Sequence, residues 1–212
     1  RIESVERRLA RLAAIDDQAR RPGAAIVPFR PPSFCSGCPH NRSTLVPDGM
    51  HAGGGIGCHG MAGRLQHIHR GFTYITQMGG EGAPWIGIAP FTETPHLFQN
   101  VGDGTFFHSA TLAVNACVAA GVNITFKILY NSAVAMTGGQ AVSGALPIPE
   151  LTRQLEAQGL RRIVILTDDL ERYRDRSPLA PSAEVRYRDE LEAVMAELQK
   201  TPGATALIYD QQ

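Results

Sequence analysis

The tripeptide Gly102–Asp103–Gly104 closes one expected strand and opens a helix, and its residue types suit phosphate and metal chemistry. Its glycines let the backbone approach a ligand closely, and the N–H groups at the start of a helix attract an anion. The Asp103 carboxylate could hold a divalent cation that bridges two phosphate oxygens. Thr105 and Thr137 could donate hydroxyl hydrogen bonds to the same phosphates.

A second oxygen ligand is expected from Asn131, which follows the next strand along the chain. Mg²⁺ prefers octahedral oxygen coordination, and Asp103, the Asn131 side-chain carbonyl and a backbone carbonyl near Ala133 would supply three ligands. Gly-Asp-Gly alone is equally typical of an ordinary turn, and Asn131 alone is typical of a strand end. The two features together favour a magnesium diphosphate site.

Glycines also crowd the stretch that follows Met78, where the backbone must turn tightly or approach another group. Met78 itself fits either the wall of a binding site or an ordinary apolar core. Glu81 could act as an acid or a base, but its glycine-rich setting suits a turn at least as well.

Cys35-x-x-Cys38 and, further along, Cys58 form a second group of reactive residues. Three thiolates in this arrangement could bind an iron–sulfur cluster. With His40 or His59 nearby they could instead bind zinc, and the spacing alone favours neither. Four cysteines in a chain of 212 residues do not form a disulfide framework, and they indicate an intracellular site for a metal or a cluster.

A regular fold must position these residues, and strands and helices alternate through the second half of the chain. The expected strands are 96–101, 124–130, 162–167, 184–187 and 205–209, and the expected helices are 106–120, 149–158 and 189–200. This alternation predicts an α/β fold with a mostly parallel sheet and helices on both faces. Such sheets bind ligands at the carboxyl ends of their strands, where Asp103 and Asn131 are expected.

Residues 1–30 are expected to be a helical connector from an upstream domain, and residues 31–212 a single domain with a cysteine-rich N-terminal segment. The connector carries an apolar helical face that comprises Ile2, Val5, Leu9, Leu12 and Ala13. Prolines between positions 22 and 32 then interrupt regular structure. Because the chain starts at Arg1 rather than Met, we expect it to be a piece of a longer protein.

The charge balance argues against nucleic-acid and membrane partners. Lys plus Arg and Asp plus Glu number 20 each, so no field of one sign would attract nucleic acid or an anionic membrane. The longest apolar runs are strand-sized and far shorter than a membrane span, and the charged N-terminal region shows no secretory signal. These features favour a cytoplasmic location.

Several phrases of the sequence resemble indolepyruvate ferredoxin oxidoreductases, most closely the long, fused form of that enzyme. They are FCSGCPHN at 34–41, GIGC at 55–58, GDGTFFH at 102–108, ILYN at 128–131 and AVAMTGGQ at 133–140. The resemblance runs from about Pro31 to the end of the chain. It implies a thiamine-diphosphate-binding fold, in which Met78 wedges between the two rings of the bent cofactor.

The resemblance also implies a set of site residues. The cofactor-binding residues would be Gly57, Cys58, Met78, Gly79, Gly80, Gly102, Asp103, Gly104, Thr105, Asn131, Ala133, Met136 and Thr137. His59 and His108 are candidate catalytic residues, although either could equally be a packing residue. Cys35, Cys38 and Cys58 would hold a [4Fe–4S] cluster. Cys117 stands in an apolar run and is expected to be a buried thiol, so the resemblance places the fourth cysteine ligand beyond the last strand.

By this resemblance the reaction is the oxidative decarboxylation of an aryl 2-oxoacid such as indolepyruvate. The acyl group would pass to coenzyme A, and electrons would pass through the cluster to ferredoxin. The resemblance implies a separate pyrimidine-binding domain and a homo-oligomeric full enzyme, so this chain alone should not turn over. Two alternatives stay open. A non-redox thiamine-dependent 2-oxoacid decarboxylase gives the cysteines no role, and a zinc-stabilised, non-catalytic module leaves the magnesium motif unexplained.

Overall fold

The computed structural model describes residues 2–20, 33–64 and 71–210, and the chain divides into two compact units, Arg1–Ser33 and Phe34–Gln212. The first unit contains the helix α1 (Ile2–Arg20), which confirms the helix expected there. Its apolar side chains Val5, Leu9 and Leu12 are each more than half exposed. The interruption expected from the prolines at 22–32 lies outside the described residues.

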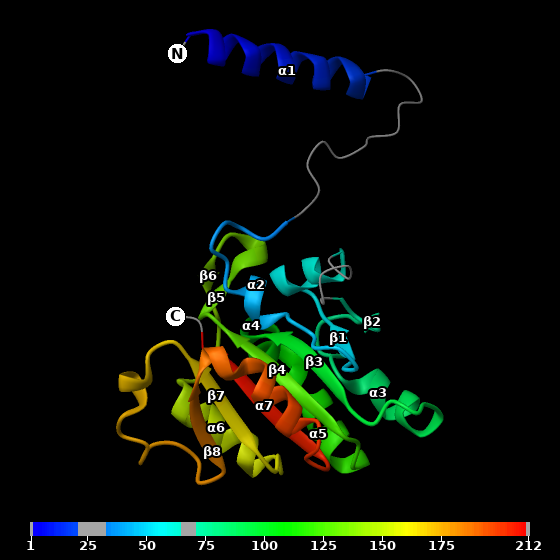
Figure 1. Cartoon of the computed structure of the whole chain (residues 1–212), viewed down its shortest axis with the longest axis vertical. Helices are drawn as coiled ribbons and strands as arrows, with labels where there is room; N and C mark the ends of the chain where they lie inside the picture. The colour runs from blue at the N-terminus through cyan, green and yellow to red at the C-terminus, as the bar shows by residue number, and fades with distance from the viewer. Residues whose placement is uncertain (1, 21–32, 65–70, 211–212) are drawn as a thin grey trace. The chain divides into compact units, whose positions relative to one another are not determined.

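The second unit is built on a seven-stranded parallel sheet (Figure 1), which confirms the predicted α/β fold. In spatial order its strands are β2 (Tyr74–Ile75), β1 (Ala52–Gly54), β3 (Leu97–Gly102), β4 (Ile124–Tyr130), β9 (Ala204–Asp210), β7 (Ile163–Thr167) and β8 (Ala183–Tyr187). Every neighbouring pair in this sheet is parallel. A separate antiparallel pair, β5 (Ala133–Val134) and β6 (Gln140–Ala141), follows β4.

Helices pack on both faces of the sheet, as predicted. The α-helices of the described part of this unit are α2 (His40–Ser43), α3 (Ala83–Ile88), α4 (Asp103–Thr105), α5 (Thr111–Ala120), α6 (Ile148–Ala157) and α7 (Leu191–Leu198). One face is covered by α3, α5 and α6, through buried side chains such as Trp85, Val114 and Leu151. The other face is covered by α7 and by the segment from Leu45 to Met50.

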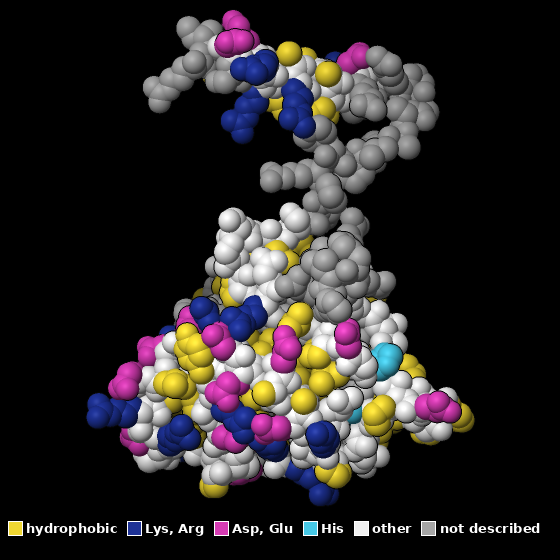
Figure 2. Space-filling view, in the orientation of Figure 1, with side chains coloured by type: hydrophobic (Ala, Val, Ile, Leu, Met, Phe, Trp, Pro, Cys, Tyr) yellow, Lys and Arg dark blue, Asp and Glu magenta, His cyan; other side chains and the backbone are white. Residues whose placement is uncertain are grey.

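The surface of this unit carries no obvious patch of one charge in the face that Figure 2 presents. Lys and Arg side chains intermingle there with Asp and Glu side chains, in keeping with the balanced composition. Within the described ranges, no helix combines the length and the apolar character needed to cross a bilayer.

The sequence does not predict β1 or the edge strand β2 beside it. β1 is a short glycine-rich stretch with low β-propensity, and β2 has only two residues. Packing explains why the glycines stand there. A Cβ on Gly53 would lie 2.2 Å from Gln99 Oε1, and a Cβ on Gly54 would lie 2.5 Å from the Phe72 ring. The Gln99 amide also donates to the Gly54 carbonyl at 3.2 Å. Side chains from distant segments therefore hold this stretch in the sheet.

Lys127 is fully buried in the middle of β4, and it yields the first testable prediction. Its Nζ donates to the Leu45 carbonyl at 3.2 Å, and burial lowers the pKa of the amine to about 7. In the unfolded chain a lysine pKa is about 10.4. Between these values the unfolded state binds more protons, so stability should rise with pH, at most by roughly 1.4 kcal/mol per pH unit.

Lys127→Met should therefore raise the free energy of unfolding at pH 6, by about 1–4 kcal/mol, because it replaces a buried unpaired charge with an apolar side chain of similar length. The substitution should also flatten the pH dependence of the free energy of unfolding between pH 7 and 10, as measured from urea unfolding curves. The exposed Lys200 provides the control, since Lys200→Met should change stability by less than about 0.5 kcal/mol. A destabilised Lys127→Met protein at pH 6 would contradict this account.

Candidate functional site

A cavity of about 370 Å³ opens at the carboxyl ends of β1, β3 and β4. The chain leaves β1 toward β2 on one side and leaves β3 toward β4 on the other, so the cavity lies at a topological switch point. Open parallel sheets bind their ligands at such points. The predicted site residues that line the cavity are Gly57, Cys58, His59, Met78, Gly102, Asp103, Gly104, Thr105, His108, Asn131, Ala133, Met136 and Thr137.

Four predicted residues do not line the cavity, namely Gly79, Gly80, Cys35 and Cys38. Gly80 is buried, and the Gly79 N–H donates to a carboxylate oxygen of Glu81 at 2.7 Å. These two glycines therefore shape the turn behind Met78 rather than the wall of the cavity itself.

Asp103 begins α4 directly after β3, and only 2% of its surface is exposed. Its Oδ2 accepts hydrogen bonds from the backbone N–H groups of Asn131 at 2.9 Å and Ser132 at 2.6 Å, and its Oδ1 accepts one from the Gly104 N–H at 2.7 Å. Burial raises the pKa of this carboxyl, and the backbone N–H groups oppose the shift. A cation bound to the carboxylate would, like the backbone N–H groups, stabilise its charged form.

Asn131 is presented to the cavity by a turn that Asp103 holds. Ser132 has a φ of 58° and is the one non-glycine residue of the described ranges in the left-handed region, a conformation that surrounding contacts must stabilise. Here the contact is the Ser132 N–H bond to Asp103. Asn131 Oδ1 accepts from the Ala133 N–H at 3.2 Å. A carbonyl oxygen has two lone pairs, so one remains for a cation.

These donors fit a magnesium diphosphate. Among the described residues, no lysine or arginine lines the cavity, so the positive charge that an anion needs there does not come from either of these side chains. A cation between Asp103 and Asn131 would supply that charge. Gly104 lies close against the hairpin of β5 and β6, because a Cβ there would lie 3.1 Å from Val134 Cγ2.

The helix expected at 106–120 is interrupted beside the cavity. After α4 the chain forms a π-helical turn (Phe106–Ala110) before α5 begins, a distortion that is frequent at functional sites. His108 lies in this turn and is exposed, with its Nδ1 2.9 Å from the Ser109 hydroxyl. It is the exposed imidazole of the cavity wall.

His59 is a buried imidazole of the wall, with 2% of its surface exposed. Burial, with a smaller contribution from His40, lowers the pKa of His59 to about 3, so its ring is neutral at pH 7. The His40 and His59 rings meet edge to face, with centroids 6.4 Å apart. His40 also lines the cavity.

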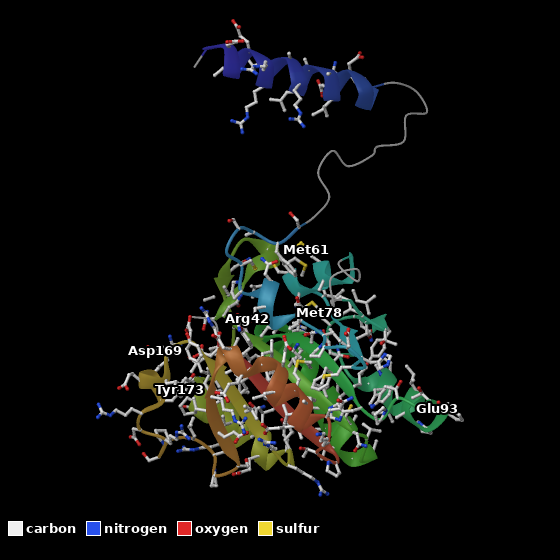
Figure 3. The ribbon with its side chains drawn as sticks, viewed as in Figure 1. Arg42, Met61, Met78, Glu93, Asp169 and Tyr173 are labelled. Carbon is white, nitrogen blue, oxygen red and sulfur yellow. The ribbon has the colours of Figure 1, made fainter. Side chains whose placement is uncertain are left out.

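Met78 is 41% exposed and lines the cavity, so the alternative of a core methionine does not hold (Figure 3). Met78→Ala should accordingly lower the free energy of unfolding by less than about 1 kcal/mol. Met195 on α7 is fully buried, and Met195→Ala should lower the free energy of unfolding by about 2–5 kcal/mol. Urea unfolding of the two variants measures both values. Equal losses in the free energy of unfolding would show that Met78 packs as a core residue.

The cysteines separate into two sets. Cys58 lines the cavity, and burial together with the charges of Cys38 and Cys35 raises the pKa of its thiol. Cys117 is fully buried in α5 and donates to the Gly82 carbonyl at 3.4 Å, and burial raises its pKa to about 12. The expected burial of Cys117 is confirmed. In the ranges described, no three His, Cys, Asp or Glu side chains are already arranged as metal ligands.

Sequence reasoning missed several residues of the site. The cavity is also lined by Ile56, Leu129, Val134, Ala135 and the run Gln140–Ser143. The sequence is compatible with Glu81 as an acid or base or as a turn residue, and its side chain is fully buried beside His59. The sequence signal for the burial of Glu81 is its position among glycines, because glycines let other segments pack closely against a neighbouring side chain.

Residues 55–207 match the family model described as thiamine pyrophosphate enzyme, C-terminal TPP binding domain. Among curated relatives, the indolepyruvate oxidoreductase subunit IorA of Methanothermobacter thermautotrophicus is 28% identical over 149 residues, which is 65% of this chain and 24% of the relative. The subunit of the same name from Pyrococcus abyssi is 30% identical over 142 residues, 58% of this chain and 22% of the relative. The chain thus spans about a quarter of the length of these relatives.

Two solved structures show the same fold. The 2-oxoglutarate:ferredoxin oxidoreductase from Magnetococcus marinus has a TM-score of 0.60 at 16% identity, with 87% of this chain and 65% of that chain covered. The benzoylformate decarboxylase from Polynucleobacter necessarius has a TM-score of 0.54 at 14% identity, with 92% and 35% covered. At these identities the likeness concerns the fold alone.

Proposed function

Since this chain belongs to the thiamine pyrophosphate enzyme family, as its C-terminal TPP-binding domain, we propose that the cavity binds thiamine diphosphate together with Mg²⁺. One observation carries the proposal. A buried carboxylate, Asp103, lies at the switch point of a parallel sheet, in a cavity whose described lining holds no lysine or arginine. A divalent cation is the group that makes such a cavity suitable for a diphosphate.

Each part of the cavity has a role in this proposal. Asp103, the Asn131 side-chain oxygen and a backbone carbonyl near Ala133 hold Mg²⁺, and Thr105 and Thr137 donate to phosphate oxygens. The exposed apolar side chains of Met78 and Met136 contact the cofactor rings, and Met78 supports the bent form. Thiamine diphosphate supplies a thiazolium carbon that attacks a 2-oxoacid, while the protein orients the reactants and excludes water.

The proposed reaction is the oxidative decarboxylation of an aryl 2-oxoacid such as indolepyruvate, with ferredoxin and coenzyme A as the other reactants. The names of the curated relatives support the substrate class. The thiols of Cys35, Cys38 and Cys58 support a redox reaction, because cysteine thiolates hold iron–sulfur clusters. The three lie near one another, since Cys38 and Cys35 add to the effect of burial in raising the pKa of Cys58. A [4Fe–4S] cluster needs a fourth ligand besides these three, and Cys117 is held elsewhere.

The two parts of the chain have separate roles in the proposed enzyme. Residues 1–30 act as a connector and residues 31–212 as the cofactor domain. A pyrimidine-binding domain of a homo-oligomeric enzyme completes the site, and free thiols suit a cytoplasmic location.

Anaerobic purification, an absorption spectrum, metal analysis and a thiamine diphosphate binding assay test this function against its alternatives. Bound iron and sulfide with broad visible absorption support the oxidoreductase. Thiamine diphosphate binding without iron favours a non-redox decarboxylase. Zinc on the cysteines, without thiamine diphosphate binding, favours the zinc-stabilised module.

A further inference from the structure

Lys127 carries a buried amine that the proposed function does not use. It lies in the middle of β4, and its side chain is fully buried. Its Nζ donates to the Leu45 carbonyl at 3.2 Å and lies 3.8 Å from the sulfur of Met195 on α7. Lysine is almost never fully buried without a paired charge, so the manner in which this amine is covered needs an explanation.

The surroundings of Lys127 do not compensate a positive charge. Its neighbours across the sheet are Asn100 on β3 and Leu207 on β9. The elements around it carry the ionisable side chains Asp48 in the segment 45–50, Glu192 and Glu197 on α7, and Tyr209 and Asp210 on β9. The pKa of the amine is nevertheless lowered, with burial as the cause. A charged amine with one carbonyl acceptor is therefore poorly accommodated here.

The segment 45–50, called the cover segment below, separates Lys127 from solvent on one side. It contains neither helix nor strand, and Leu45 and Met50 are partly buried against the core under it. The N–H groups of these two residues bond to carbonyls three positions earlier in the chain, at 3.0 and 3.1 Å. Segments with few buried apolar contacts open at low free energy. The cover segment can therefore leave the sheet without breaking the bonds between strands.

We propose that the contact between Lys127 and the cover segment is a pH-sensitive switch: the neutral amine suits the closed form, and protonation favours a local opening that admits water. Water solvates an ammonium group far better than a single carbonyl does. The closed form lowers the pKa of the amine to about 7, whereas a lysine in water has a pKa of about 10.4. Since the open form binds the proton more tightly, opening becomes more favourable as the pH falls from about 10 to about 7, and it levels off below that.

The switch adjoins the candidate functional site through α2. The cover segment follows this helix after Thr44, whose hydroxyl donates to the His40 carbonyl at 2.6 Å. His40 lines the cavity. Opening of the cover segment would therefore remove a support of the helix that forms part of the cavity wall. The switch itself does not depend on which ligand the cavity binds.

Hydrogen exchange of the 212-residue chain, read by mass spectrometry between pH 6 and pH 8, tests the switch. The measured quantity is the protection of the cover segment, which is the intrinsic exchange rate divided by the observed rate, where closing is faster than exchange. In the wild type the protection should fall about fivefold from pH 8 to pH 7 and about twofold more to pH 6. In Lys127→Met it should change by less than about twofold over the whole range.

Two variants and one strand serve as controls. Lys200→Met removes an exposed lysine, and His51→Gln removes the histidine that follows the cover segment. Both variants should keep the wild-type pH dependence of the protection. The central strand β9 should be at least about tenfold better protected than the cover segment at each pH, because central core strands open at the highest free energies.

Three outcomes would overturn the proposal. The first is a protection of the wild-type cover segment that does not change between pH 8 and pH 7. The second is loss of the pH dependence in His51→Gln, which would assign it to that histidine. The third is equal protection of β9 and the cover segment, which would mean that Lys127 meets water only on global unfolding. If Lys127→Met does not fold, the wild-type and His51→Gln measurements decide.

Discussion

Asp103→Ala should weaken the magnesium-dependent binding of thiamine diphosphate by at least about 100-fold, or roughly 2.7 kcal/mol. The carboxylate would be the anionic ligand of the cation, and it also holds the turn that presents Asn131, through bonds to the Asn131 and Ser132 N–H groups. Isothermal titration calorimetry with thiamine diphosphate, with and without Mg²⁺, measures the loss.

Two variants separate the charge of Asp103 from its structural role. Asp103→Asn keeps one oxygen that can accept from the Asn131 and Ser132 N–H groups, gives up the acceptor of the Gly104 N–H and removes the negative charge. It should therefore fold and still lose most magnesium-dependent affinity. Asp169→Asn removes an exposed carboxylate that lies well to the left of Met78 in Figure 3 and should bind as the wild type does. Equal affinity of the wild type and Asp103→Asn would show that the metal is held elsewhere.

Cys58→Ser should abolish the visible absorption of an anaerobically reconstituted iron–sulfur cluster, because iron–sulfur clusters are held by cysteine thiolates. Cys58 is the cysteine that lines the cavity. Its raised pKa implies that the free thiol is mostly protonated at pH 7, so cluster assembly should release protons. Bound iron and sulfide per chain quantify the loss.

Cys117→Ser is the matched control for this experiment. The Cys117 thiol, within α5, donates to the carbonyl of Gly82, the residue before α3, and a serine hydroxyl can donate in the same place. This variant should keep the cluster. Loss of the cluster in Cys117→Ser, or its retention at full iron content in Cys58→Ser, would contradict the proposed ligand set.

The parts of the site that the sequence predicts are those set by local patterns. Asp103 and Asn131 each follow a strand with a clear pattern, and the parallel pairing of β3 with β4 brings the two strand ends together. The strand expected at 124–130 is confirmed at both ends, since a mostly apolar segment rich in β-branched and aromatic residues is typical of a strand.

The parts that the sequence does not predict depend on contacts between distant segments. Glu81 is buried because Gly55 leaves room for it, and nothing within the glycine-rich turn itself indicates this. Met78 has the composition of a core residue but lines a cavity, because its exposure depends on how three loops meet. β1 likewise is a strand only because Gln99 and Phe72 pack against its glycines.

The central claim, that Asp103 holds the metal of a thiamine diphosphate site, is tested most directly by a crystal structure of the chain with thiamine diphosphate and Mn²⁺. The account predicts an anomalous peak about 2.1 Å from the Asp103 carboxylate, with the Asn131 side-chain oxygen as a second ligand and the diphosphate in the cavity at the ends of β1, β3 and β4. A metal bound away from Asp103, or a cofactor outside this cavity, would contradict it.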